Sequence, residues 1–443
     1  EGIPVFLADI KGDLSGLAKA GQWTPKLEER YKLLGITDPF EPQAFPVRLW
    51  DVFGQAGHPV RATVEGMGSL LLSRLLDLNE TQSGILAIVF KVAQEKDWPL
   101  LDLKDLQSLL KEVYEHSSEY SAQYGNITKQ SVGAIQRSLL VLEEEGADQF
   151  FGEPALDLND FMQLDASGRG YINILSATKL FHSPKLYSTF LIWMLSRLFE
   201  TLPEVGDPEK PKLVFFFDEA HLLFKDASKL FLEKVEQVVR LIRSKGVGIY
   251  FITQNPQDLP ESVLAQLGNR VQHALRAYTP KEMKAIKVAA QSFRPNPDFD
   301  TETVITELGT GEALVSFLNE KGQPSVVERA YILSPQSSFD LLNESEQLAL
   351  ITTSPFHQKY ATTIDRESAY EKLAAKASKE AQEKEQKEAE KEEATADKAA
   401  QKRSPGRPRK SSLEKAKDSF LSSLFRTIAR EIAKLIMGSF KRK

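Results

Sequence analysis

The stretch Lys212-Leu-Val-Phe-Phe-Phe-Asp218-Glu219-Ala-His221 determines how the rest of the chain is interpreted. Its five apolar residues, from Leu213 to Phe217, are too few for a helix and are typical of a strand buried on both faces. Two adjacent carboxylates follow, and residues 220–231 suit a helix. The stretch predicts a buried parallel strand that ends in two acidic side chains. An ordinary buried strand followed by an exposed acidic turn is the alternative interpretation.

Composition limits the classes of protein and of site. The chain has 443 residues, of which 42% are hydrophobic, so it can bury a large core. It has no cysteine, which excludes disulfides, thiol catalysis and zinc-thiolate sites. The six histidines are scattered without metal-binding spacing, and the net charge of −6 gives no overall basic field for nucleic acid.

Targeting signals are also absent from the sequence. No apolar run approaches the roughly 20 residues of a membrane span, and no signal peptide is visible. We therefore expect a soluble, cytoplasmic protein. The first residue is Glu1 rather than methionine, and it leads directly into an apolar run. From this we expect that the native N-terminal segment is missing.

Strands alternating with helices predict an α/β fold with a mostly parallel sheet and right-handed crossovers. Residues 1–62 and 151–335 are the two parts of this α/β core, and residues 63–150, which have helical periodicity and few strand signals, are interpreted as an all-α insertion. Strands are predicted at 3–8, 47–53, 171–175 and 249–254, helices at 22–35, 185–202 and 230–245, and a closing hairpin at 312–317 and 325–330.

Polar residues follow several of these strands, and parallel α/β sheets gather functional groups at such carboxyl ends. Gln254 ends the strand at 249–254. Asp9 and Asp13 follow the first strand, where one interpretation has them position water or a metal ion. The other interpretation is a solvated turn in which Asp13 caps a helix that begins at Leu14.

Phosphate binding in a P-loop enzyme requires the pattern GxxxxGK[ST], whose backbone N–H groups and lysine hold the phosphates. The sequence lacks this pattern, because Gly12, Gly16 and Gly21 have the wrong spacing and no GK[ST] follows them. At face value, this argues against nucleotide hydrolysis. The chain begins, however, at what would be the second strand of such a fold, so the phosphate loop would precede Glu1.

Several strings together resemble one family. Over residues 1 to about 335 the chain is similar to HerA/FtsK-type P-loop ATPases, in the helicase HerA-like, bacterial YjgR branch. The resemblance implies a RecA-like core whose Walker A motif, the phosphate loop, lies before Glu1, so that this chain alone would not hydrolyse ATP. The strings are Val5–Leu14, Gly57–Thr63, Gln130–Arg137, Leu213–Leu223, Arg240–Gly248, Thr253–Pro256 and Leu267–Arg276.

The resemblance also implies roles for individual residues. Asp218 resembles the residue that binds Mg²⁺ through water, and Glu219 resembles the base that orients and deprotonates the attacking water. Gln254 resembles the residue that senses the γ-phosphate. Asp9 and Lys11 are assigned to cofactor binding beside them.

In rings of this family, an arginine of one subunit reaches the nucleotide of the next and stabilises the developing phosphoryl charge. The resemblance makes Arg243 the first choice, with Arg270 and Arg276 as alternatives. Each of these arginines also suits a surface or interface salt bridge. His221 is expected to pack beside the site rather than to catalyse.

The function that the resemblance implies is ATP hydrolysis, with Mg²⁺, coupled to translocation or remodelling of DNA by a homo-oligomeric, hexameric ring. Two alternatives remain open. One is an ATPase that acts on protein or at a membrane surface. The other is a nucleotide-free scaffold, which the missing phosphate loop supports.

The C-terminal part is charged. Folding is predicted to stop near Pro335, and residues 336–418 are predicted to be a linker whose block at 365–403 is a solvated helix or disorder. Residues 404–443 carry eleven Lys/Arg against three Asp/Glu. Within them, Pro405–Lys410 resembles an AT-hook core but also suits a generic basic linker. Residues 419–443 predict a basic amphipathic helix that docks on protein, lies on an anionic membrane or self-associates.

Overall fold

The computed structural model describes residues 1–206, 208–224 and 229–401. Residues 1–375 form one compact unit, and residues 376–443 belong to a second. The AT-hook-like segment and the predicted amphipathic helix at 419–443 lie outside the described residues. In the described part of the chain, none of the helices is both long enough and apolar enough to cross a membrane.

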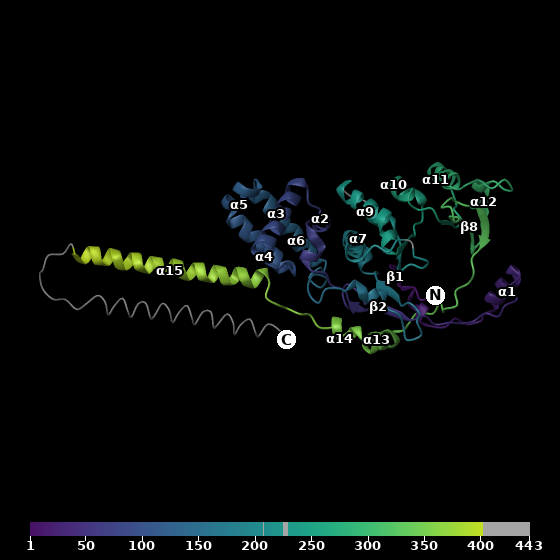
Figure 1. The fold of residues 1–443 in the computed structure, drawn as a ribbon, viewed down its shortest axis with the longest axis horizontal. Helices are drawn as coiled ribbons and strands as arrows, with labels where there is room; N and C mark the ends of the chain where they lie inside the picture. Colours follow the sequence, from purple (N-terminus) through teal and green to yellow (C-terminus); the bar gives the residue numbers. More distant parts are fainter. Residues whose placement is uncertain (207, 225–228, 402–443) are drawn as a thin grey trace. The chain divides into compact units, whose positions relative to one another are not determined.

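A six-stranded parallel sheet lies at the centre of the first unit (Figure 1). Its strand order is β3-β2-β4-β1-β5-β6, so β5, which contains the opening apolar run, lies between β1 and β6. The predicted α/β class with a mostly parallel sheet is confirmed. The strands are β1 (Val5–Asp9), β2 (Val47–Asp51), β3 (His58–Pro59), β4 (Ile172–Ser176), β5 (Leu213–Phe217) and β6 (Val247–Phe251).

One face of the sheet packs into the main hydrophobic core. Phe6, Phe215 and Phe217 are fully buried there with the apolar side chains of α7 (Pro184–Thr201) and α9 (Lys229–Leu241). Figure 1 shows these helices on the opposite side of the sheet from α13 (Glu344–Thr353). The opening stretch is therefore a buried strand, as predicted.

The other face is covered only in part. Leu49, Ile174, Leu7, Phe216 and Tyr250 lie side by side in one row across β2, β4, β1, β5 and β6. The first two are buried beneath the segment that leads into α13, the next two are partly buried, and Tyr250 is 56% exposed. Parallel sheets are usually covered on both faces. The row therefore ends at an edge strand, β6, where Tyr250 faces solvent.

The described elements of the all-α insertion are five helices, and they share the main core with the sheet. Leu72, Ile85, Leu106 and Ile135 belong to the same buried cluster as Phe215. The insertion is therefore continuous with the core rather than a separately packed unit. Its helices are α2 (Val64–Leu75), α3 (Glu80–Lys96), α4 (Leu103–Glu115), α5 (Ser117–Tyr124) and α6 (Lys129–Glu144).

A smaller antiparallel sheet follows β6 in the chain and has a core of its own. Ile286, Phe293 and Leu314 are buried in this second cluster. The predicted hairpin corresponds to two of its strands, with an order of β7-β8-β9. The elements are β7 (Arg270–Gln272), α11 (Pro280–Gln291), α12 (Thr301–Glu307), β8 (Glu312–Ser316) and β9 (Glu328–Tyr331).

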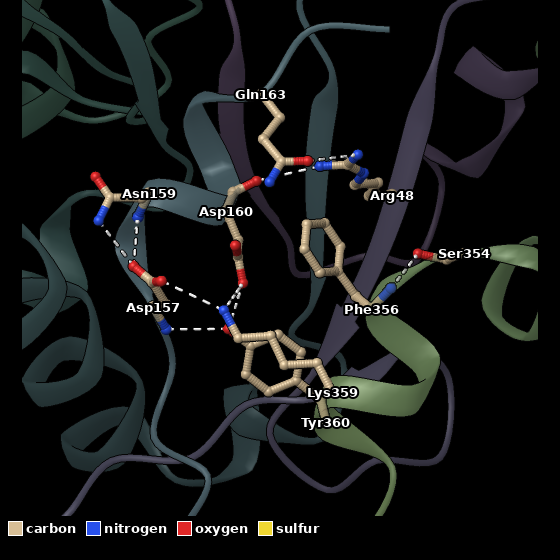
Figure 2. Close-up of polar contacts among 9 residues, drawn as sticks. All are labelled: Arg48, Asp157, Asn159, Asp160, Gln163, Ser354, Phe356, Lys359 and Tyr360. Carbon is tan, nitrogen blue, oxygen red and sulfur yellow. Dashed lines mark hydrogen bonds and ion pairs between the residues drawn. The ribbon is translucent and has the colours of Figure 1, made fainter.

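Residues 336–368, here called the C-terminal strap, differ from the predicted charged linker. Phe356 and Tyr360, on α14 (Phe356–Tyr360), insert into the main core, and their polar neighbours are drawn in Figure 2. The strap also forms a β-bridge between Ile364 and Glu153. The folded part therefore extends well beyond Pro335. The strap leads into α15 (Ala369–Gln401). Of the two alternatives predicted for residues 365–403, a solvated helix or disorder, this segment is the helix.

The end of the strap is fixed by Asp105 of α4, which is fully buried. Its carboxylate accepts hydrogen bonds from the backbone N–H groups of Leu101 and Asp102 at 2.7 and 3.1 Å. It also accepts bonds from the Ser368 hydroxyl and the Tyr370 N–H, at 2.5 and 2.8 Å. One carboxylate thus joins the beginnings of α4 and α15.

Replacing Asp105 by alanine is expected to lower the free energy of unfolding by about 3 kcal/mol, because buried N–H and O–H donors lose a charged acceptor. Thermal unfolding followed by circular dichroism measures this loss. The exposed Asp148→Ala is the matched control and should unfold like the unchanged protein. Equal stability of the two variants would contradict the role of Asp105.

Candidate active site

Three neighbouring strands bring their carboxyl ends to one edge of the sheet. Because β1, β5 and β6 are adjacent and parallel, the residues that follow them meet there. Asp218 and Glu219 follow β5 directly, and Gln254 follows β6. The polar residues that follow these three strands are far apart in the sequence, and the fold brings them to the same edge of the sheet.

Glu219 is the most constrained of these residues. Glu219 is buried, with 7% of its surface exposed. Its backbone φ of 49° lies in the left-handed region that non-glycine residues rarely adopt. The following N–H, of Ala220, donates to the Ile252 carbonyl at 2.8 Å and ties the turn to the end of β6. Such backbone strain is held in place only where the surrounding structure determines it, often at functional sites.

Gln254 reaches Glu219 from the neighbouring strand. Its Nε2 donates to Glu219 Oε1 at 3.2 Å and lies 3.5 Å from Oε2. His221 Nδ1 lies 3.3 Å from Glu219 Oε2, but at an angle that makes no hydrogen bond. The Glu219 carboxylate is thus oriented by an amide donor on one side, with the imidazole packed on the other.

Asp218 lies at the mouth of the site and is partly buried. Burial raises the pKa of Asp218, and the nearby charge of Glu219 acts in the same direction, whereas Lys11 and the Glu219 N–H favour the carboxylate. The Glu219 N–H donates to Asp218 Oδ1 at 2.9 Å. Lys11, which follows β1, therefore acts electrostatically on the site from the adjacent strand.

The turn is also held from α7 by Tyr187. Tyr187 is fully buried, and its hydroxyl donates to the backbone carbonyl of Asp218 at 2.9 Å. Burial, together with the charges of Asp218 and Glu219, raises the pKa of Tyr187, so that it stays a neutral donor. The sequence did not single out this tyrosine, because one hydroxyl in an otherwise apolar helix carries no local signal.

Asp9 has a structural role in its own loop. Its carboxylate accepts hydrogen bonds from the N–H groups of Gly12, Asp13 and Leu14, at 2.7, 3.1 and 3.0 Å. Asp51 organises the loop after β2 in the same way. The short helix η1 (Ser15–Ala18) has no side-chain cap, so the alternative in which Asp13 caps it is wrong. Asp9 and Lys11 were both predicted to bind the cofactor. The Asp9 carboxylate is occupied by its own loop, whereas the Lys11 side chain is exposed and could reach a ligand.

The three candidate arginines lie in two different places. Arg243 is exposed on η4 (Ile242–Lys245), at the amino end of β6 and so at the opposite end of this strand from Gln254. Arg270 donates to the Ser292 carbonyl at 2.7 Å, and Arg276 donates to the Leu308 carbonyl at 2.8 Å. Arg270 and Arg276 therefore stabilise the small antiparallel sheet and its helices.

The side chains that could hold a metal ion at this site are few. In the described part of the chain, no group of three or more His, Cys, Asp and Glu side chains could form a complete protein cage for a metal ion. Mg²⁺ does not need such a cage, since it is usually held by one or two carboxylates together with substrate phosphates. A single partly buried carboxylate such as Asp218 fits that pattern.

Comparison with known proteins gives a family and distant relatives. The family model described as Helicase HerA-like C-terminal matches residues 1–443. The DNA double-strand break repair helicase HerA of Saccharolobus solfataricus is 24% identical over 211 residues, which are 47% of this chain and 40% of that protein. The protein of the same description from Sulfolobus acidocaldarius is 30% identical over 99 residues, 22% of this chain and 19% of the relative. The chain thus matches less than half the length of these curated relatives.

Two solved structures have a similar arrangement of elements. VirB4 of Thermoanaerobacter pseudethanolicus is 15% identical, with a TM-score of 0.47 and coverage of 75% of this chain and 83% of that one. The plasmid coupling protein TrwB in complex with ADP and Mg²⁺ is 11% identical, with a TM-score of 0.44 and coverage of 78% of this chain and 88% of that one.

Proposed function

This chain belongs to the helicase HerA-like C-terminal family, and from that premise we propose that it supplies the metal-binding and water-activating side of an ATPase site. In this proposal, the complete protein hydrolyses ATP with Mg²⁺ and uses the energy to move or remodel DNA as a ring. The single observation that carries the proposal is the buried, strained Glu219 held by Gln254 beside Asp218.

The geometry supports a division of labour between the three residues. Asp218 would hold Mg²⁺ through water, and the bound ion would neutralise charge on the β- and γ-phosphates. Glu219 would accept a proton from the attacking water as general base. Gln254, whose amide now donates to Glu219, would orient that carboxylate and detect the γ-phosphate beside it. Tyr187 would keep the turn in place from α7.

We also propose that the phosphate-binding loop comes from residues outside the described sheet and pairs along β6. Tyr250 and Ile252 are 56% and 47% exposed at this edge, and among the described strands β6 has only β5 as a neighbour. A strand–loop–helix unit would extend the sheet, cover these apolar side chains and place backbone N–H groups beside Gln254. A segment that precedes Glu1 is the source we propose for this unit.

Arg243 supports the ring in this proposal. With five residues at ~3.3 Å each, β6 separates Arg243 from Gln254 by about 16 Å, so this arginine does not serve its own site. Its exposed position at the amino end of β6 suits contact with a neighbouring subunit's nucleotide. The hexameric ring, the DNA partner and a cytoplasmic location stay predictions.

Gln254→Ala is expected to lower kcat for ATP hydrolysis about 100-fold, because one preorganised donor beside the reacting water is lost. Nucleotide affinity and thermal stability should change little, since Gln254 itself is exposed. A coupled ATPase assay of the protein carrying its phosphate-binding loop measures the effect. Gln257→Ala on η5 (Pro256–Asp258) is the matched control with unchanged turnover, and an equal loss in both variants would argue against the assigned role.

The same assay tests the choice between DNA and other substrates. DNA that stimulates turnover, with binding that weakens steeply as salt rises, is expected for a DNA translocase. Turnover that is not stimulated by DNA but is stimulated by a protein or a membrane surface would favour the alternative, an ATPase that acts on protein or at a membrane. No turnover at all in the complete protein would favour the nucleotide-free scaffold.

A further inference from the structure

Within the first compact unit, residues 270–294 form a segment rich in positive charge. Residues 270–294 contain six Lys/Arg and a single acidic residue, Glu282, whereas the whole chain has 56 Lys/Arg and 62 Asp/Glu. Glu282 is already engaged, because its carboxylate accepts the backbone N–H groups of Tyr278 and Thr279 in a capping box at the start of α11. One carboxylate against six Lys/Arg leaves this segment with a net charge of +5.

The helix α11 divides cleanly into a buried face and a charged face. Ile286, Ala289 and Ala290 are buried in the second core cluster. Its three lysines, at positions 281, 284 and 287, are exposed, and within the described residues none of them forms an ion pair with a carboxylate. They lie within about 9 Å along the helix axis, a length that spans roughly three phosphates of one strand at the duplex spacing of about 3.4 Å of axis each.

An exposed aromatic ring adjoins the lysines. Tyr278, just before α11, is 88% exposed, and Met283 on the charged face is 52% exposed. Arg294 is exposed a few residues beyond the other end of the helix. Lysines that track a phosphate backbone beside an aromatic side chain that stacks on bases are the usual combination for binding single-stranded nucleic acid.

We propose that the exposed face of α11, with Tyr278 at its start, is a nucleic-acid contact surface that favours single strands. The proposal deepens the proposed function and rests on it for the polymer that the ring would move. An anionic membrane suits this face less well, because the apolar side of α11 is buried in the core and is not available for insertion. An acidic protein would use the lysines but would not require Tyr278.

The surface also lies next to the sensing end of the candidate active site. The helix α11 packs against η5, the loop that directly follows Gln254. Figure 1 shows α10 (Glu261–Leu264) and α11 close together beyond this loop. A strand bound along α11 is therefore one packed loop away from the residue proposed to detect the γ-phosphate.

The test compares binding of a fluorescent oligo-dT and of a duplex by variants of the full 443-residue chain, over a range of salt. The triple variant Lys281→Gln, Lys284→Gln and Lys287→Gln is expected to bind oligo-dT at least tenfold more weakly, with the logarithmic salt slope lowered by about two to three. The matched control replaces the exposed Lys26, Lys96 and Lys129 by glutamine and should bind like the unchanged chain. Tyr278→Ala should weaken oligo-dT about tenfold and the duplex little.

Residues 404–443 are also basic, so a second readout locates the contact directly. Lysine acetylation followed by mass spectrometry, with and without oligo-dT, should show protection at the three lysines of α11 but not at positions 26, 96 and 129. Absence of protection, or equal binding by the triple variant and its control, would overturn the proposal. So would tight competition by polyglutamate, which would indicate an acidic protein. Binding and acetylation are measured without nucleotide, so they do not depend on ATP hydrolysis, and failure of the ATPase proposal is recognised separately in the turnover assay.

Discussion

Replacing Glu219 by glutamine is expected to abolish ATP hydrolysis, by about 1,000-fold or more, in the protein that carries its phosphate-binding loop. The change removes the proton acceptor but keeps the size of the side chain and an oxygen that accepts the Gln254 amide. The strained turn at Glu219 is also retained, because its bonds are made by the backbone and by Tyr187. Binding of a fluorescent ATP analogue should therefore persist while steady-state turnover disappears.

The matched control for this variant is Glu233→Gln on α9, where the carboxylate is exposed and 4.0 Å from Lys229. Exposed pairs of this kind contribute little to stability, so the control should hydrolyse ATP normally. A Glu219→Gln protein that turns over at the control's rate would show that the water is activated elsewhere. Loss of nucleotide binding together with turnover would instead indicate that the edge of the sheet had rearranged.

Replacing Tyr360 by alanine is expected to lower the free energy of unfolding by about 3–5 kcal/mol, the range for removing a large buried aromatic side chain. Tyr360 is fully buried, and its ring lies 5.5 Å from that of Trp50. Its hydroxyl donates to Asp160 Oδ2 at 2.5 Å and accepts the Asp157 N–H at 3.0 Å (Figure 2). Asp160 is itself buried and would keep only Lys359, at 2.8 Å, from the strap.

Thermal and urea unfolding measure this effect, and two further variants separate its causes. Tyr360→Phe keeps the ring and loses only the hydroxyl. It should therefore lower the free energy of unfolding by about 1–2 kcal/mol. Tyr370→Ala on α15, where the side chain is 48% exposed, should be nearly neutral. If Tyr360→Ala were as stable as Tyr370→Ala, the strap would not be part of the folded core.

Local sequence patterns predicted the sheet well because its strands are short apolar runs that end in polar residues. The run at 213–217 became β5, and the residues after β1, β5 and β6 were brought to one edge, as parallel pairing requires. Asp218, Glu219 and Gln254 lie together as this pattern predicted, and their roles stay predictions. The insertion was recognised by its helical period, but its common core with the sheet depends on contacts that no local pattern specifies.

The C-terminal strap and the details of the site were not predictable in the same way. Leu342, Phe356 and Tyr360 lie in a segment that is mostly polar, and they become core only because the sheet offers complementary surfaces. Asp9 had the right position for a ligand, but three backbone N–H groups of its own loop occupy its carboxylate. A single residue pattern does not distinguish these two uses of a carboxylate.

The most direct test of the central claim compares ATP hydrolysis by the 443-residue chain with that by the same chain joined to the phosphate-binding unit that we propose to precede Glu1. We expect background turnover from the 443-residue chain, and Mg²⁺-dependent turnover from the extended chain that Glu219→Gln removes. Hydrolysis by the 443-residue chain alone would contradict the claim that it holds only the metal-binding and water-activating side of the site. If the extended chain hydrolysed ATP equally well with Glu219→Gln, the assignment of Glu219 as the residue that activates water would be wrong.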